Sequence, residues 1–197
     1  GIQRHRLITD GGGVTTLAAF RDCTLRCAYC LNPQSLRQET PCQHLTPQQL
    51  YEQVKKDELY FLATDGGVCF GGGEPCLRTD FIEEFCKICP KEWLITIETA
   101  LNVPSDNIRK LQPFVNLWIV DIKDMNPAIY QSYTPRGTER VISNLKILSE
   151  ARANVMIRVP QIPEYNTEAD VNASIEQLKA LGFSNFDKFT YITEINK

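Results

Sequence analysis

Three cysteines that lie close together in the chain are the residues best suited to chemistry. Cys23, Cys27 and Cys30 have the spacing C-x3-C-x2-C, which lets three thiolates converge from one compact loop on an inorganic cluster. Three protein ligands would leave one iron open for a substrate or cofactor. Two other interpretations are a zinc site completed by Cys42 and reduced cysteines without a ligand. Because zinc ligands typically come as two separated pairs, the spacing favours an iron–sulfur cluster.

The elements that would position this loop alternate between strands and helices. The expected strands are Thr16–Phe20, Gly67–Phe70, Leu94–Glu98, Val115–Val120, Asn154–Val159 and Lys188–Ile192. The expected helices are Thr46–Leu62 (opened by a capping box of Thr46 and Gln49), Thr79–Cys89, Ser105–Leu111, Glu139–Ala153 and Glu168–Leu181. This alternation predicts an α/β fold with a parallel sheet, in one domain over residues 1–197. The pattern alone does not separate a doubly wound sheet from a curved, partial barrel.

Composition and charge restrict the class of protein. A hydrophobic fraction of 43% and a charged fraction of 23% are typical of a globular protein. The formal net charge of −3 gives no support for a nucleic-acid or membrane-surface binder, and no apolar run approaches the roughly 20 residues of a membrane helix. There is no apolar signal segment at the N-terminus, and three of the eight cysteines cluster, so we expect a cytoplasmic protein rather than a disulfide-bonded secreted one.

A glycine-rich segment follows the second expected strand. Gly71-Gly72-Gly73-Glu74-Pro75 comes directly after Gly67–Phe70, and glycines expose the backbone to close ligand approach, although alone the segment would be read as a plain turn. Together with the cysteine loop, in which Tyr29 precedes the last cysteine, it resembles the signature of the radical S-adenosylmethionine (SAM) superfamily. The resemblance implies a [4Fe–4S] cluster on Cys23, Cys27 and Cys30, and SAM contacts from Tyr29, Gly72, Gly73 and Glu74.

Three further segments resemble the activating enzymes of glycyl radical enzymes. Asp10, Gly11, Gly12 and Gly13 look like a family loop that lies near the substrate peptide. Asp121-Ile122-Lys123 resembles a D-x-K motif, and by this resemblance Lys123 pairs with the SAM carboxylate. Arg158 resembles an arginine that contacts the methionine or ribose region of SAM. The match runs from Asp10 to about Tyr191 and implies a single-domain, TIM-like partial (β/α)6 barrel, without the ferredoxin-like insert of some relatives.

The same resemblance implies a monovalent-cation site beside SAM. Glu98 and Thr99 match an Asp-Thr pair of the family, and with Asp121 and the backbone of Ile119 they could hold the cation. Glu98 is one methylene longer than the aspartate that it replaces. The alternative for Asp121, Lys123 and Arg158 is an ordinary set of surface salt bridges, which contribute little stability.

The function implied by the resemblance is the activation of a partner protein. The enzyme would cleave SAM reductively at the cluster to a 5′-deoxyadenosyl radical, which abstracts a hydrogen atom from a glycine Cα of a glycyl radical enzyme. A flavodoxin- or ferredoxin-type reductant is implied as well, and we expect a monomer. Two alternatives stay open: a radical SAM reaction on a small molecule or peptide, as in the queuosine pathway, and a non-enzymatic iron–sulfur or zinc module. Gly12 stands where the family has proline, which bears on the protein substrate, and Thr193 and Glu194 are the polar candidates for SAM contacts near the C-terminus.

Overall fold

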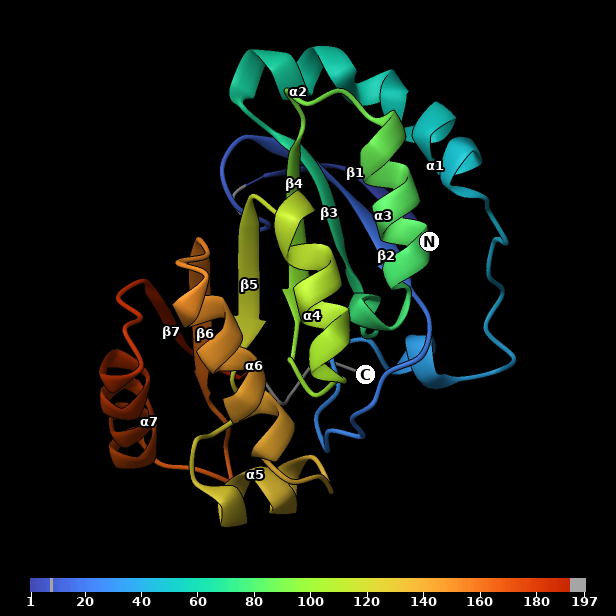
Figure 1. Cartoon of the computed structure of the whole chain (residues 1–197). Helices are drawn as coiled ribbons and strands as arrows, with labels where there is room; N and C mark the ends of the chain where they lie inside the picture. The colour runs from blue at the N-terminus through green and yellow to red at the C-terminus, as the bar shows by residue number, and fades with distance from the viewer. Residues whose placement is uncertain (8, 192–197) are drawn as a thin grey trace.

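A curved sheet organises the chain. The computed structural model describes residues 1–7 and 9–191. In these residues the strands follow one another across the sheet in chain order. They are β1 (Ile2–Leu7), β2 (Val14–Phe20), β3 (Gly67–Gly72), β4 (Leu94–Thr99), β5 (Leu117–Asp121), β6 (Val155–Gln161) and β7 (Phe186–Thr190). β1 is antiparallel to β2, and all other neighbours are parallel, so their C-terminal ends gather at one end of the sheet (Figure 1).

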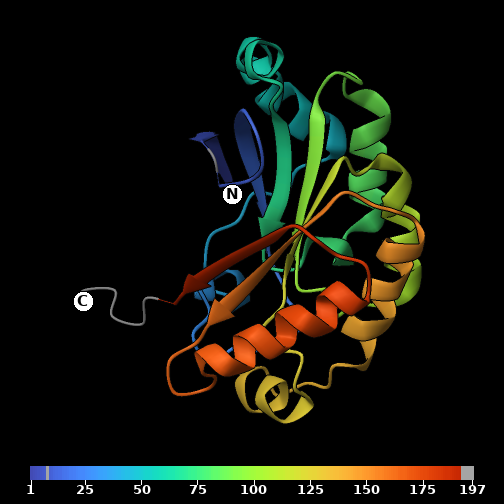
Figure 2. The same ribbon diagram turned by 90° about the vertical axis from the view of Figure 1, so that its left-hand side faces the viewer.

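Helices connect the parallel strands and cover one face of the sheet. They are α1 (Pro47–Val54), α2 (Glu58–Thr64), α3 (Thr79–Ile88), α4 (Ser105–Leu111), α5 (Pro127–Tyr133), α6 (Glu139–Glu150) and α7 (Glu168–Ala180). Figure 2 shows α3, α4 and α6 along one side of the strands, with the opposite face of the sheet left concave. Because β1 and β7 do not pair within the described residues, the barrel is open, as a partial barrel requires. None of the described helices is long and apolar enough to cross a membrane.

The two faces of the sheet differ in chemistry because side chains alternate along each strand. The helix-covered face is apolar and belongs to the main core; it includes Val68, Phe70, Ile95, Ile97, Trp118, Val120, Ile157 and Val159. The residues between them point into the barrel and include Cys69, Thr96, Glu98, Asp121 and Arg158. Burial of the outer face drives folding, and the inner face keeps the polar groups from which a site can be built.

Most expected elements are confirmed, with four corrections. The expected helix Thr46–Leu62 begins with the Thr46 and Gln49 capping box but is divided by a 3₁₀ turn at Lys55–Asp57. The last strand occupies Phe186–Thr190 rather than Lys188–Ile192, and Ile192 lies outside the described residues. Two elements, β1 and α5, were not expected: β1 is largely polar and exposed, and α5 is only seven residues long.

The position of β1 depends on a buried carboxylate. Arg4 Nε donates to Asp57 Oδ1 at 2.9 Å and Thr16 Oγ1 donates to Asp57 Oδ2 at 2.6 Å, while His5 Nε2 lies 3.0 Å from the same carboxylate. Burial raises the pKa of Asp57, but the hydrogen bonds from Arg4 and Thr16 outweigh burial and hold the pKa below its usual value. This contact joins β1 and β2 to the turn between α1 and α2, which accounts for the break in the expected helix.

Candidate active site

The loop after β2 brings the three clustered cysteines to the C-terminal end of the sheet. Cys23, Cys27 and Cys30 are half-buried free thiols, and all three line one cavity. The loop is held from two sides, because Asp22 N donates to the Ser35 carbonyl and Ala28 N donates to the Tyr133 carbonyl, both at 3.0 Å. The structure therefore brings together the cysteines that the spacing singled out.

The spacing of the thiols fits a cluster better than a single zinc ion. Ligand sulfurs around one zinc, each about 2.3 Å from the metal, lie about 4 Å apart. The three sulfurs do not all lie within 4.8 Å of one another; among the described residues, the trio that meets this limit is Asp10, Cys69 and Glu98. Cys42, the fourth ligand in the zinc interpretation, instead contacts Arg21 Nη1 at 3.3 Å and His44 Nε2 at 3.6 Å. A larger inorganic group suits the donor set that the loop provides.

Burial affects the protonation of these thiols. Burial raises the pKa of Cys23, and it raises the pKa of Cys27 to about 11 although the positive charge of Lys123 acts in the opposite direction. Both thiols are therefore protonated near neutral pH when they have no ligand. Since thiolate is the form that binds iron, loading the loop releases protons.

The glycine motif supports the cysteine loop through its backbone. Gly73 N donates to the Phe20 carbonyl at 3.0 Å, and Glu74 N donates to the Asp22 carbonyl at 2.7 Å. A Cβ at Gly73 would lie 2.2 Å from the Asp22 carbonyl oxygen, and Gly72 has a φ of +90°. Only glycine allows this close approach at both positions. Both glycines line the thiol cavity, where their backbone is open to a ligand.

The Glu74 side chain is buried beside the cavity and is not among the residues that line it. It is 1% exposed and accepts hydrogen bonds from Thr99 Oγ1 at 2.8 Å, Cys76 N at 3.1 Å and Ala100 N at 3.1 Å. Burial raises the pKa of Glu74, and these donors act in the opposite direction. These contacts make Glu74 a brace between the glycine motif and the end of β4, and a contact of Glu74 with SAM stays a prediction.

Lys123 supplies the positive charge of the cavity. Its Nζ lies 3.4 Å from Asp121 Oδ2 and 3.3 Å from the Tyr191 hydroxyl, and only 7% of the residue is exposed. Burial lowers the pKa of Lys123, but Asp121 and Tyr191 outweigh burial and hold the pKa well above its usual value. The ammonium is therefore charged near neutral pH, which is the property needed to bind a carboxylate. Tyr191 lines the same cavity and was not identified from the sequence.

Arg158 and Glu98 form an ion pair inside the barrel. Arg158 Nη1 lies 2.8 Å from Glu98 Oε1, and both side chains are 18% exposed. Arg158 also donates to the Thr9 carbonyl and lies 3.8 Å from Asp187. Glu98 lines the thiol cavity, whereas Arg158 is not among its lining residues. Arg158 therefore reaches the cavity through Glu98, and a direct contact of Arg158 with SAM stays a prediction.

The residues of the expected cation site are near one another but already have partners. Glu98 is bound to Arg158, Asp121 lies beside Lys123, and the Thr99 hydroxyl donates to Glu74 and accepts from Leu101 N at 2.9 Å. Ile119, whose backbone would complete the site, is fully buried in β5. Lys123 and Arg158 thus balance the two carboxylates, and these contacts do not favour an added monovalent cation. The cation site stays a prediction.

The remaining residues that the sequence predicts for the site are Tyr29 and those of the Asp10–Gly13 loop. The Tyr29 ring lines the cavity, and its hydroxyl donates to Glu164 Oε2 at 2.8 Å. Asp10 is buried and accepts from Arg6 Nη2 at 2.6 Å and from Thr15 Oγ1 at 3.1 Å. In the Asp10–Gly13 loop, Asp10 therefore fixes the backbone and Gly12 is exposed. Thr193 and Glu194 lie outside the described residues.

The partial barrel and its thiol-lined cavity define an enzyme class that binds an iron–sulfur cluster and a second ligand at one end of the sheet. The chain belongs to the radical SAM superfamily, whose family model matches residues 18–185. This superfamily uses a [4Fe–4S] cluster and SAM, which are therefore the cofactors of an enzyme that acts by radical chemistry.

Two curated relatives are activating enzymes. The chain is 26% identical over 228 residues to the (2S)-3-sulfopropanediol dehydratase activating enzyme of Klebsiella oxytoca, with 85% of this chain and 72% of that protein covered. It is 28% identical over 171 residues to the pyruvate formate-lyase-activating enzyme of Clostridium pasteurianum, with 87% and 70% covered. The similarity to activating enzymes, first noted from the motifs, is thus confirmed.

Solved structures confirm the fold. SuiB of Streptococcus suis, bound to its precursor peptide SuiA, superimposes with a TM-score of 0.70 at 14% identity, over 92% of this chain and 41% of SuiB. Coproporphyrinogen III oxidase (HemN) from Escherichia coli, a radical SAM enzyme, superimposes with a TM-score of 0.60 at 15% identity, over 89% of this chain and 44% of HemN. At these identities the likeness concerns the fold alone, and it agrees with a TIM-like partial barrel.

Proposed function

We propose that this chain activates a glycyl radical enzyme by abstracting a hydrogen atom from a glycine Cα of that partner. The observation that carries the proposal is one cavity lined by Cys23, Cys27 and Cys30 together with Lys123 and the Gly72–Gly73 segment. Such a cavity offers ligands for the cluster and separate groups for the charged methionine end of SAM. Two curated relatives that are activating enzymes support the choice of a protein substrate.

Each side chain around the cavity has a role in binding or positioning. Lys123, held by Asp121 and Tyr191, would bind the SAM carboxylate, and the exposed backbone carbonyls of the glycine motif would accept from the SAM ammonium. Tyr29 would shield the cluster from solvent. When bound, the cluster supplies the electron that breaks the S–C5′ bond of SAM and gives methionine and the 5′-deoxyadenosyl radical. No acid–base side chain is needed for this step.

The barrel leaves room for a partner along its concave face. The concave face of the sheet is not covered by helices (Figure 2), and the Asp10–Gly13 loop lies against that face, where Thr9 accepts from Arg158. Gly12 is the exposed member of the loop, so the loop would meet the partner through its glycines while Asp10 holds it in place. A single domain without a ferredoxin-like insert, a monomeric state and a cytoplasmic location belong to the same proposal.

The experiment has two stages and is done without oxygen. The chain is reconstituted with iron and sulfide, reduced and given SAM, and 5′-deoxyadenosine is measured for the wild type and for the Cys23→Ala, Cys27→Ala and Cys30→Ala variants. Cys86→Ala is the matched control, because Cys86 is a half-buried cysteine of α3 that packs against the core. We expect deoxyadenosine from the wild type and the control, and none from the cysteine-loop variants.

The second stage tests the partner. A candidate glycyl radical enzyme is added, and electron paramagnetic resonance is used to detect a glycyl radical in it. A radical formed only with the active chain and SAM supports the proposal. Deoxyadenosine without a glycyl radical in any candidate, but with turnover of a small molecule, would replace the proposed substrate. Tight zinc binding with no iron bound would reject the function altogether.

A further inference from the structure

Cys42 is a thiol that the proposed function does not use. It lies between the 3₁₀ turn Pro33–Leu36 and α1, and it is not among the residues that line the thiol cavity. It is a half-buried free cysteine that lines a second pocket, of about 450 Å³, bounded by β2, α1 and α3. The question is therefore what a thiol at the wall of this pocket can react with.

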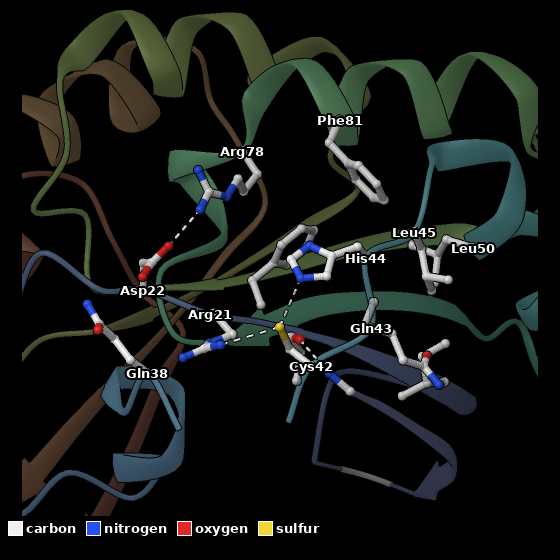
Figure 3. Close-up of a pocket in the computed structure, with 15 residues that line it drawn as sticks. Arg21, Asp22, Gln38, Cys42, Gln43, His44, Leu45, Leu50, Arg78 and Phe81 are labelled. Carbon is white, nitrogen blue, oxygen red and sulfur yellow. Dashed lines mark hydrogen bonds and ion pairs between the residues drawn. The ribbon is translucent and has the colours of Figure 1, made fainter. Parts of the chain in front are cut away.

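His44 is placed to take the proton of the Cys42 thiol. Its Nε2 lies 3.6 Å from Cys42 Sγ, and Figure 3 shows the His44 ring directed at this sulfur. In the tautomer that carries the ring proton on Nδ1, Nε2 is an acceptor for the S–H group. A nucleophile with a base within hydrogen-bonding reach is the arrangement of an activated nucleophile.

The charges around Cys42 favour a reaction partner that carries carboxylates. Arg21 Nη1 lies 3.3 Å from Cys42 Sγ, and Arg21 also donates to the Arg37 carbonyl, which fixes the guanidinium beside the sulfur. Arg78 lines the same pocket and binds Asp22, with Nη2 2.6 Å from Oδ2 (Figure 3). Since Asp22 neutralises Arg78, the charge of Arg21 stays available to an anionic group that enters the pocket.

The size and the floor of the pocket suit a small molecule. Leu45, Leu50 and Phe81 line it (Figure 3), and Leu50 is buried in the core. The volume of about 450 Å³ falls within the range of small-molecule sites, about 300–1,000 Å³, which are mostly apolar with a few polar groups. The apolar floor would accept the carbon and sulfur atoms of a ligand, while Arg21 would bind its carboxylate.

The other cysteines outside the cysteine loop are poorer nucleophiles. Cys69 and Cys76 are fully buried, and burial raises the pKa of both thiols well above the usual value. Burial also raises the pKa of Cys86 to about 12 and the pKa of Cys89 to about 11. These four thiols are therefore protonated near neutral pH, whereas the thiolate is the form that reacts. A reagent that enters the pocket would select Cys42.

We propose that Cys42 is a modification site, which forms a mixed disulfide with a carboxylate-bearing disulfide of low molecular weight. The Cys42 sulfur attacks one sulfur of that disulfide while His44 takes the thiol proton. A new S–S bond forms, the old one breaks, and the leaving thiolate takes the proton from His44. The Cys42 sulfur is oxidised and the leaving sulfur is reduced, so no further oxidant is needed. An excess of the reduced small thiol reverses the exchange.

The test uses the reconstituted chain with its cluster, without oxygen, and glutathione disulfide as the probe. Mass spectrometry of the intact chain follows the adduct, and peptide mapping finds the modified residue. We expect one adduct, on Cys42, in the wild type and in the matched control Cys86→Ala, and none in Cys42→Ser. Dithiothreitol should remove it. His44→Gln should react at least about 10-fold more slowly, and because His44 is exposed, this variant keeps the fold.

A second probe tests the charge preference of the pocket. Cystamine, a disulfide with two ammonium groups, should react with the wild type more slowly than glutathione disulfide at low salt. The difference should shrink near 1 M salt, where the Debye length is about 3 Å. Equal rates for the two probes at low salt, or a His44→Gln variant as fast as the wild type, would overturn the proposal. Adducts on Cys86, Cys89 or the cysteine loop in place of Cys42 would overturn it as well. Because Cys42 does not line the thiol cavity, each of these outcomes leaves the proposed function untouched.

Discussion

Replacing Gly73 by alanine should displace the cysteine loop. The added Cβ would lie 2.2 Å from the Asp22 carbonyl oxygen, and backbone rather than a flexible side chain would have to move. Two backbone hydrogen bonds cross this contact, from Gly73 N to Phe20 and from Glu74 N to Asp22. Loss of both costs about 1 kcal/mol each, and the steric strain adds about 1–3 kcal/mol. We therefore expect the free energy of unfolding to fall by about 3–5 kcal/mol, a large part of the 5–15 kcal/mol typical of a domain.

The same substitution at Gly12 is the matched control. A Cβ at Gly12 meets no atom within 4 Å, so Gly12→Ala should change the free energy of unfolding by no more than about 1 kcal/mol. Urea unfolding measures both variants, and iron and sulfide analysis after reconstitution reports the state of the loop. We expect Gly73→Ala to bind less iron than Gly12→Ala. Wild-type stability together with full iron content in Gly73→Ala would refute the view that the glycine motif supports the loop.

Three further predictions concern buried charges. Because the pKa of Asp57 is lowered in the folded chain, its carboxylate stabilises the fold above the usual pKa of aspartate, and this stability is lost as pH falls below about 4. Acid unfolding curves of Asp57→Asn should therefore lack this loss. A loss parallel to that of the wild type would contradict the role of Asp57. In a double-mutant cycle, Glu98→Gln and Arg158→Gln should couple by about 1–3 kcal/mol, measured by urea unfolding, and additive effects would show that the pair is unimportant. Glu74→Gln should lower the free energy of unfolding by about 1–3 kcal/mol, because the NH2 group of the glutamine would face the Ala100 N–H donor, which now binds a carboxylate oxygen. Calorimetry that shows an unchanged melting temperature would reject the role of Glu74 as a brace.

The strands and long helices were predictable because their signals are local. β3 and β5 are continuous apolar runs, and the Thr46 and Gln49 capping box is formed by residues three positions apart. β1 was missed because its residues are mostly polar and exposed, so hydrophobic periodicity gives no signal. Its pairing depends on the distant Asp57, whose role in the break between α1 and α2 is a tertiary effect.

The site was predictable where a motif carries it and not where distant residues meet. The cysteine loop and Gly72–Gly73 are consecutive in the chain, and the cavity contains both. The contact of Glu98 with Arg158 joins residues 60 positions apart, and its cause is the register that pairs Asp121 with Arg158 across β5 and β6. Tyr191 follows the last strand without any motif around it, and only the folding of the sheet brings it beside Lys123.

The irregular shape of β1 affects how readily the molecule aggregates. It forms one edge of the sheet, and an exposed edge can recruit strands from other molecules into aggregates. The register of β1 shifts between Gln3 and Arg6, and His5 within that interval has a φ of +57°, so the backbone offers no regular row of hydrogen-bonding groups. Arg4 and Arg6 make this edge basic. The irregular, basic edge protects the regular strand β2 beneath it from intermolecular pairing.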